Sequence, residues 1–150
     1  MASYEEHERR CTAKFERTKF AKHPHEHTRG KYDSWDMSLT ARTNSEDTYN
    51  IEMKNRDIPY DKYADEGFMV EKIKYDALME AYRETGSKPI FMVFFRDGGY
   101  YCNLLDIPDP EWIFMWCTKS TADGTYGNKK VRKEVMLVYP KDGKRFTYES

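Results

Sequence analysis

Two segments in the first half of the chain alternate between apolar and polar residues. The first spans residues 33–42 (DSWDMSLTAR) and the second spans residues 49–54 (YNIEMK). Because successive side chains of a β-strand point to opposite faces, each pattern predicts a half-buried strand with one apolar and one polar face. The polar stretch between them, residues 43–47, predicts a short turn, so the two strands are expected to form a β-hairpin.

A helix is predicted on each side of this hairpin. Ser3 and Glu6 fit a capping box, which predicts a first helix over about residues 4–19. Residues 21–30 (AKHPHEHTRG) follow it and are predicted to form a loop. The apolar stripe of the first helix consists of Tyr4, Cys11 and Phe15, and Glu8 lies on the same stripe.

The second helix is predicted over about residues 68–85. Gly86 supplies its stop signal, since glycine is common just after a helix ends. Its apolar residues recur at helical spacing and are Val70, Ile73, Ala77 and Ala81.

The second half of the chain is dominated by predicted strands. Residues 89–95 (PIFMVFF) are continuously apolar, as expected for a central strand buried on both faces. Further strands are predicted within YYCNLLD (100–106), WIFMWC (112–117), VRKEVMLVYP (131–140) and RFTYE (145–149). Helices alternating with hairpins and strands predict an α/β or α+β fold with a mixed sheet.

Composition narrows the class of protein. A length of 150 residues predicts one domain, residues 1–150. The 25 Lys and Arg nearly balance the 26 Asp and Glu, so any nucleic-acid binding has to rest on a local basic patch. The three cysteines show no paired spacing, and no signal-peptide pattern or membrane-length apolar run is present. A soluble, cytoplasmic protein is therefore expected.

The hairpin brings three ionisable side chains to its polar face. With the turn centred on residue 45, Asp36 lies opposite Lys54 and Ser38 lies opposite Glu52, so Asp36, Glu52 and Lys54 share one face. Asp36 and Glu52 are then diagonal neighbours, with Cβ atoms roughly 7 Å apart. Two carboxylates at that separation can both reach one Mg²⁺ or Mn²⁺ ion.

These residue types suit the hydrolysis of a phosphodiester. A divalent cation lowers the pKa of a bound water molecule and offsets charge on the phosphate, and carboxylates are the ligands that Mg²⁺ and Mn²⁺ prefer. A nearby ammonium can orient water or phosphate, and the adjacent carboxylates keep it protonated.

Asp36 followed by Glu52-Met53-Lys54 resembles the PD-(D/E)XK nuclease superfamily, with its restriction-endonuclease-like fold. The resemblance covers a helix–hairpin–helix–strand core of about residues 3–106, and residues 107–150 look like a C-terminal extension. It implies that Asp36, Glu52 and the Met53 carbonyl bind the metal and that Lys54 is catalytic. Some members add a carboxylate from the first helix, for which Glu8 is the candidate.

The resemblance implies a Mg²⁺- or Mn²⁺-dependent deoxyribonuclease acting on DNA, with RNA as another possible substrate. Compact members of the family, including junction resolvases and phage or mobile-element nucleases, suggest a homodimer. Three alternatives stay open. Glu52 and Lys54 can form an ordinary surface ion pair, the fold can serve as a non-catalytic binding or assembly module, or the chain can be an unrelated α+β adaptor.

Other chemistry-bearing residues have simpler explanations. A basic run with Lys129, Lys130, Arg132 and Lys133, extended by Arg56, can contact phosphates or merely guard a strand edge. The histidines at positions 23, 25 and 27 invite a metal site but lack partners at a recognisable spacing, so a polar loop is expected. Cys11 and Cys102 are expected to be structural thiols. The tyrosines at 100–101 and the WIFMW run are expected in the core rather than as stacking platforms for bases.

Overall fold

The fold was analysed on a computed structural model of the chain. The structure describes residues 4–27, 35–41, 46–62, 67–120 and 126–149, with the backbone alone at 4–5, 118–120 and 126–129. The predicted cap at Ser3 lies outside the described residues. No helix in these ranges is long and apolar enough to cross a membrane.

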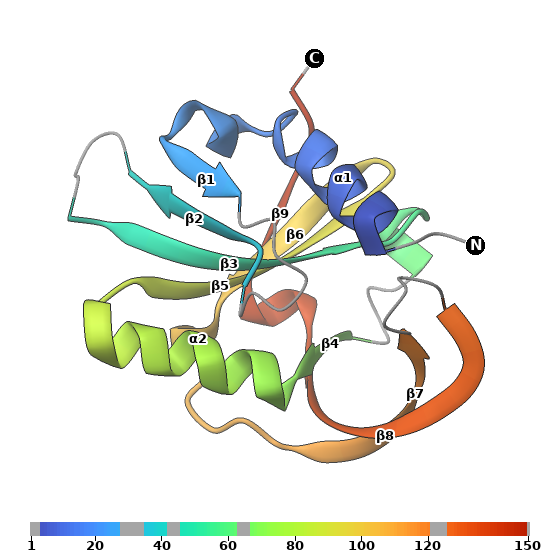
Figure 1. Cartoon of the computed structure of the whole chain (residues 1–150). Coiled ribbons are helices and arrows are strands. Elements are labelled where there is room, and N and C mark those ends of the chain that lie inside the picture. Colours follow the sequence, from blue (N-terminus) through green and yellow to red (C-terminus); the bar gives the residue numbers. More distant parts are fainter. Residues whose placement is uncertain (1–3, 28–34, 42–45, 63–66, 121–125, 150) are drawn as a thin grey trace.

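A six-stranded mixed sheet forms the centre of the molecule (Figure 1). Its strands lie in the order β1-β2-β3-β5-β6-β9, and only β3 and β5 run parallel. The parallel pair needs a crossover connection, which helix α2 provides. The strand bounds are β1 His25–His27, β2 Met37–Thr40, β3 Thr48–Asn55, β5 Lys88–Phe95, β6 Gly98–Asn103 and β9 Lys144–Phe146.

Helices α1 (Tyr4–Phe15) and α2 (Lys72–Thr85) cover opposite faces of this sheet (Figure 1). On the α1 side, Cys11 and Phe15 pack against alternate residues of the central strands, such as Ile51 and Met92. On the α2 side, Leu78 packs in a second cluster whose members are Phe91, Val93, Phe95, Tyr100, Leu104, Met136 and Val138 among others. Burial on both faces explains the continuous apolar run of β5.

A second sheet of three strands curls beneath the first, in the order β4-β8-β7 (Figure 1). Its strands are β4 Phe68–Glu71, β7 Ile113–Ser120 and β8 Tyr126–Val138. Met136 and Val138 of β8 belong to the same buried cluster as Phe91 of β5. The C-terminal residues thus contribute to the core, and β9 completes the edge of the main sheet beside β6.

The mixed α+β fold and the order helix, hairpin, helix, strand are confirmed, but several local predictions are wrong. The segment predicted as a loop after α1 forms a 3₁₀ turn (Lys19–Lys22) and then strand β1, which pairs with β2. The second helix begins only at Lys72, because residues 68–71 form β4. The helical phase shifts with it, so Ile73 is 75% exposed rather than buried.

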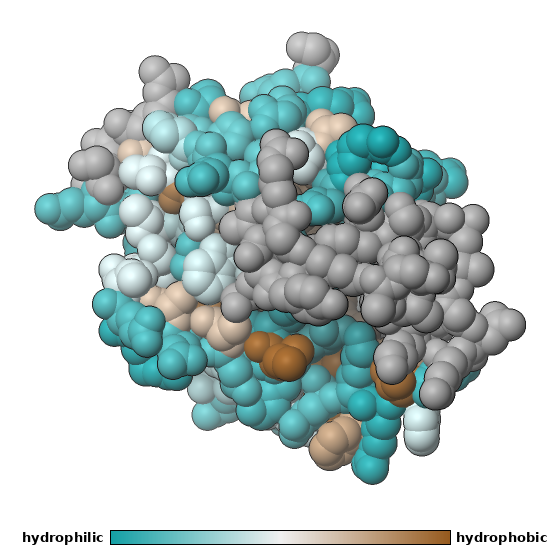
Figure 2. Space-filling view, in the orientation of Figure 1, coloured by the Kyte–Doolittle hydropathy of each residue, from teal (hydrophilic) through white to brown (hydrophobic). Residues whose placement is uncertain are grey.

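Further along the chain, two short apolar stretches also differ from their predictions. Residues 104–106, predicted as the end of a strand, form a 3₁₀ turn. Most of the WIFMW run is not core: within β7, Phe114 is 56% and Trp116 is 68% exposed, whereas Trp112 just before β7 packs against the buried cluster. Gly86 ends α2 as predicted, with φ of 80°. In the view of Figure 2, exposed hydrophobic residues form small separate patches on a largely hydrophilic face.

The hairpin forms with a register two residues away from the predicted one. Met37 pairs with Ile51 and Ser38 with Asn50, so paired positions sum to 88 rather than 90. A shift of two keeps every side chain on its predicted face, because the strand period is two. The polar face is nevertheless buried, and Glu52 is only 3% exposed, since α2 and the small sheet cover it.

Gly143 provides a test of how tightly β9 is held. A Cβ atom at this position would lie 2.2 Å from the Tyr101 carbonyl oxygen and 2.7 Å from Cβ of Cys102. Gly143→Ala is therefore expected to lower the free energy of unfolding by about 1–3 kcal/mol, as overpacking does. Gly86→Ala is the control, because an added Cβ there meets no atom within 4 Å and only its positive φ opposes the change. A denaturation midpoint of Gly143→Ala equal to that of the wild type would contradict the packing of β9.

Candidate active site

Strand β3 carries Glu52 and Lys54 on the same side of the sheet, close to the strand's C-terminal end. Their side chains turn toward each other, with 3.8 Å between Lys54 Nζ and Glu52 Oε2. The pair differs from a solvated surface ion pair, because the Glu52 side chain is 4% and the Lys54 side chain 29% exposed.

Asp36, the residue just before β2, lies next to this pair. Its backbone N–H donates to the Ile51 carbonyl at 2.9 Å, which extends the hairpin ladder by one step. Its carboxylate Oδ2 accepts a hydrogen bond of 2.7 Å from the backbone N–H of Met53. The observed register places Asp36 level with Glu52 rather than diagonal to it, and the Asp36 carboxyl contributes to the raised pKa of Glu52. The convergence of Asp36, Glu52 and Lys54 therefore agrees with the prediction, although the register behind it was wrong.

Glu52 is buried in surroundings that disfavour an ionised carboxylate. Burial raises the pKa of Glu52 to about 8; the Lys54 ammonium opposes this rise and the Asp36 carboxyl adds to it. Glu52 Oε1 is buried and has no hydrogen-bond partner among the residues that the structure describes. A buried acceptor without a partner is costly. A divalent cation between Asp36 and Glu52 would satisfy it, so these residues fit the implied metal.

Lys54 is surrounded by acids. Burial alone would lower the pKa of Lys54, but Glu52, Glu71 and Asp36 more than offset this effect and raise it. Glu71 lies at the end of β4 and accepts a hydrogen bond of 2.6 Å from Lys133. The Lys54 side chain is thus a stable cation at neutral pH, able to attract a phosphate.

A pocket of about 290 Å³ opens beside Lys54. Lys54 and Arg56 provide its charged wall, and Met115 of β7 lies on the wall formed by the small sheet. The remaining lining is apolar and consists of Gly67, Phe68, Met69, Phe91, Val93 and Leu137. Lys54 therefore borders an opening that is large enough for a phosphate group and bounded by both sheets, whereas Asp36 and Glu52 do not line it.

Glu8, the candidate third ligand, does not join this group. Among the described residues, Asp36 and Glu52 belong to no set of three Asp, Glu, His or Cys ligand atoms within 4.8 Å of one another. On α1, His7 Nε2 and Cys11 Sγ lie 3.7 Å apart, and the charges of Asp36 and Lys54 act on both residues. His7 lies four residues before Cys11, and Glu8 lies three residues before it. Helical spacing therefore puts both beside the buried stripe, and the spacing offers no reason to prefer Glu8.

His7 and Cys11 are not an activated nucleophile pair. Burial, followed by Lys54 and Arg56, lowers the pKa of His7 to about 4. Burial raises the pKa of Cys11 to about 12. A thiol attacks as its thiolate, which is scarce under these conditions. The expectation of a structural thiol therefore agrees with the burial of Cys11, and of Cys102 as well.

The predicted phosphate-contacting residues have different surroundings. Lys130 and Arg132 are exposed on β8, and the Arg132 guanidinium lies 4.2 Å from the ring centre of Phe114. Lys133 is already bonded to Glu71. The side chain of Lys129 lies outside the described part of the chain. Arg56 lies beside Lys54 in the pocket.

Comparisons with known proteins found a similar solved structure but no matching protein-family model and no matching curated protein. The chain is similar to the solved structure of Hjc, a Holliday junction resolvase from the archaeal hyperthermophile Archaeoglobus fulgidus, with a TM-score of 0.47 and 13% sequence identity. The similarity covers 83% of this chain and 85% of that one.

Proposed function

We propose that this protein is a divalent-metal-dependent nuclease that hydrolyses phosphodiester bonds in DNA. The observation that carries the proposal is the convergence of Asp36, Glu52 and Lys54, with an unpartnered oxygen of Glu52 inside the group. A surface ion pair has no reason to be buried. A site built to receive a cation does.

The residues divide the chemistry between them. Asp36 and Glu52 would hold Mg²⁺ or Mn²⁺, and the Met53 backbone carbonyl is a further proposed ligand. The cation supplies a water molecule of lowered pKa and offsets charge on the phosphate. Lys54 binds a phosphate oxygen or orients the attacking water. The hydrogen bond from Met53 N–H fixes the Asp36 carboxylate against the strand, which limits the motion of one ligand.

The face of the small sheet that is turned away from the pocket offers a surface for the rest of the nucleic acid, because Trp116 follows Met115 of the pocket wall and so points to the other side. Trp116 pairs with Arg132 across β7 and β8, so the two side chains emerge on the same face. Exposed aromatic rings can stack on bases, and neighbouring cations contact phosphates. We propose that Arg132 and Lys130 bind the backbone of the substrate while Trp116 stacks against a base, which supports a single-stranded or distorted substrate.

The test is cleavage of linear, nicked, single-stranded and branched DNA with Mg²⁺ or Mn²⁺. Trp116→Ala should weaken binding of single-stranded and branched DNA, in which unstacked bases are available, whereas Arg132→Ala should weaken binding of every DNA form. Both variants should leave Mn²⁺ binding unchanged, which calorimetry can measure separately. Stacking is worth about 1–3 kcal/mol per base, so the Trp116 variant should bind roughly 5- to 100-fold more weakly. Cleavage of no DNA form with either metal would overturn the proposal.

A non-catalytic binding module on the same fold is the second candidate. The observation in its favour is the near-complete burial of Glu52, together with the lack of a third clustered carboxylate among the described residues. It predicts Mn²⁺ and DNA binding with no cleavage. An unrelated adaptor is not supported, because Asp36 and Glu52 lie together on one side of the hairpin.

A further inference from the structure

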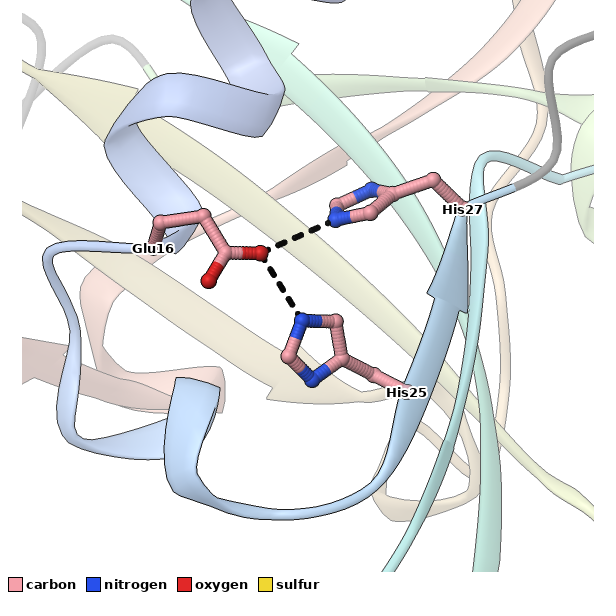
Figure 3. Close-up of side chains that lie close together, drawn as sticks. All are labelled: Glu16, His25 and His27. Carbon is pink, nitrogen blue, oxygen red and sulfur yellow. Dashed lines mark hydrogen bonds and ion pairs between the residues drawn. The ribbon is translucent and has the colours of Figure 1, made fainter.

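A second cluster of ligand-type side chains lies away from the candidate active site, where the end of α1 meets β1 (Figure 3). Glu16 is the residue after the end of α1, and His25 and His27 lie on β1. Two residues apart on a strand, the two imidazoles point to the same side. All three side chains converge, and their ligand atoms lie within 4.8 Å of one another.

The distances inside this cluster suit a small metal ion. Glu16 Oε1 lies 2.8 Å from His25 Nε2 and 3.3 Å from His27 Nε2. Zinc bonds to nitrogen and oxygen are about 2.0–2.2 Å long, so neighbouring ligand atoms of a tetrahedral site are about 3.3 Å apart. The Glu16–His27 distance already matches this spacing, and the Glu16–His25 distance is about 0.5 Å shorter than it.

The hydrogen bonds of His25 prepare it as a ligand. Its Nδ1 lies 2.7 Å from the His23 carbonyl oxygen, and because a carbonyl can only accept, Nδ1 carries the hydrogen. Nε2 donates in turn to the Glu16 carboxylate at 2.8 Å, and a metal ion would take the place of that hydrogen, binding the Nε2 lone pair and the Glu16 oxygen. An imidazole anchored through its other nitrogen to a backbone carbonyl is the usual second shell of a metal-binding histidine.

The surroundings of the cluster also favour an ion. Both imidazoles lie edge-on to Phe15, at 5.0 Å for His25 and 5.9 Å for His27, and their side chains are 15% and 11% exposed. Within the described part of the chain the buried Nδ1 of His27 has no hydrogen-bond partner, and Nε2 is the atom through which that ring meets the cluster. Glu16 is 49% exposed, which leaves room for water as a fourth ligand.

We propose that Glu16, His25 and His27 bind a Zn²⁺ ion that ties the end of α1 to the edge strand of the six-stranded sheet. Two imidazoles and one carboxylate are a ligand set typical of zinc, whereas Mg²⁺ prefers oxygen alone. The ion would hold β1 in its place at the edge of the sheet. Strand β1 has three residues, lies at the edge of the sheet and, among the described strands, pairs with β2 alone.

The test is titration of the chelator-treated full-length protein with Zn²⁺ in excess Mg²⁺, followed by calorimetry. One equivalent is expected to bind. Glu16→Gln and His27→Gln should each weaken that binding by at least roughly 10- to 100-fold, the range found even for residues that only support a ligand. His23→Gln is the matched control, since its side chain is outside the cluster and its backbone carbonyl remains; it should bind Zn²⁺ like the wild type.

Thermal unfolding separates loss of the site from loss of the fold. Zn²⁺ should raise the melting temperature of the wild type and of His23→Gln, because it binds only the folded state, but not that of Glu16→Gln. Glu52→Gln tests the location: it should retain the zinc equivalent. Absence of zinc binding by the wild type, or binding lost in Glu52→Gln and intact in His27→Gln, would overturn the proposal whatever the outcome of the cleavage assay.

Discussion

Glu52→Gln is expected to reduce DNA cleavage by at least about 10³-fold, the upper end of the cost of removing one charge-stabilising group. The amide has nearly the same shape as the carboxyl but carries no charge, so the variant should also lose measurable Mn²⁺ binding. The measurement is single-turnover cleavage alongside Mn²⁺ titration. Glu80→Gln, the same change at an exposed position of α2, is the control and should behave like the wild type.

The same variant is expected to be more stable than the wild type when metal is absent. Glu52 is 3% exposed and its Oε1 lacks a partner, so the folded state bears the cost of a buried carboxylate. Removing the charge should raise the free energy of unfolding by about 1–3 kcal/mol near pH 8. Lys54 keeps Asp36 and Glu71 nearby and is partly exposed, so it is not stranded by the change.

Because of Glu52, the stability of the metal-free protein is expected to fall as the pH rises. The pKa of Glu52 rises on folding from its ordinary 4.5 to about 8, so the folded state holds the proton more tightly than the unfolded state. Its contribution is therefore fully present below about pH 4.5 and is lost as the pH rises through about 8. Urea unfolding of the metal-free wild type should show this loss across the interval, whereas Glu52→Gln should show much less of it.

Metal should reverse the loss in the wild type alone. Mn²⁺ that binds the folded state stabilises it by linkage, and at high pH the ionised Glu52 is its ligand. Two results would contradict the proposed role of Glu52: a Gln variant that is less stable than the wild type at pH 8, or one that still gains stability from Mn²⁺.

The alternation of apolar and polar residues was enough to predict the hairpin and the faces of its side chains. The spacing of Asp36, Glu52 and Lys54 therefore led to their convergence even though the register was wrong, because a shift of two residues preserves the face. Burial of that polar face could not be predicted in the same way. It depends on α2 and the small sheet, which come from residues 68–138 and cover the site only in the folded chain.

Local signals failed where tertiary contacts decide the structure. Residues 68–71 fit the phase of the following helix, but pairing with β8 makes them a strand. The histidines of β1 were expected to lie in a polar loop because no partner was visible at a regular spacing. Glu16 reaches them from the end of α1, nine and eleven residues earlier in the chain. The exposure of Trp116 follows from the curl of β7 and β8, which the apolar run alone does not reveal.

Lys54→Met is expected to separate catalysis from metal binding. The methionine keeps much of the length and packing of the lysine but removes its charge, so cleavage should fall by about 10²–10³-fold. Asp36 and Glu52 are unchanged, and Mn²⁺ binding should persist. In metal-free protein the change should lower stability, opposite to Glu52→Gln, because the Lys54 ammonium is the cation that opposes the burial cost of Glu52.

The double variant Glu52→Gln/Lys54→Met then tests whether the two side chains act as a pair. Its metal-free stability should exceed that of Lys54→Met, since no buried carboxylate is left without its cation. Lys62→Met, an exposed lysine in the 3₁₀ turn Tyr60–Lys62, is the control for loss of a positive charge and should cleave normally. Cleavage by Lys54→Met at the wild-type rate would show that Lys54 has no part in the reaction. Cleavage lost together with Mn²⁺ binding would make Lys54 a support for the metal ligands instead.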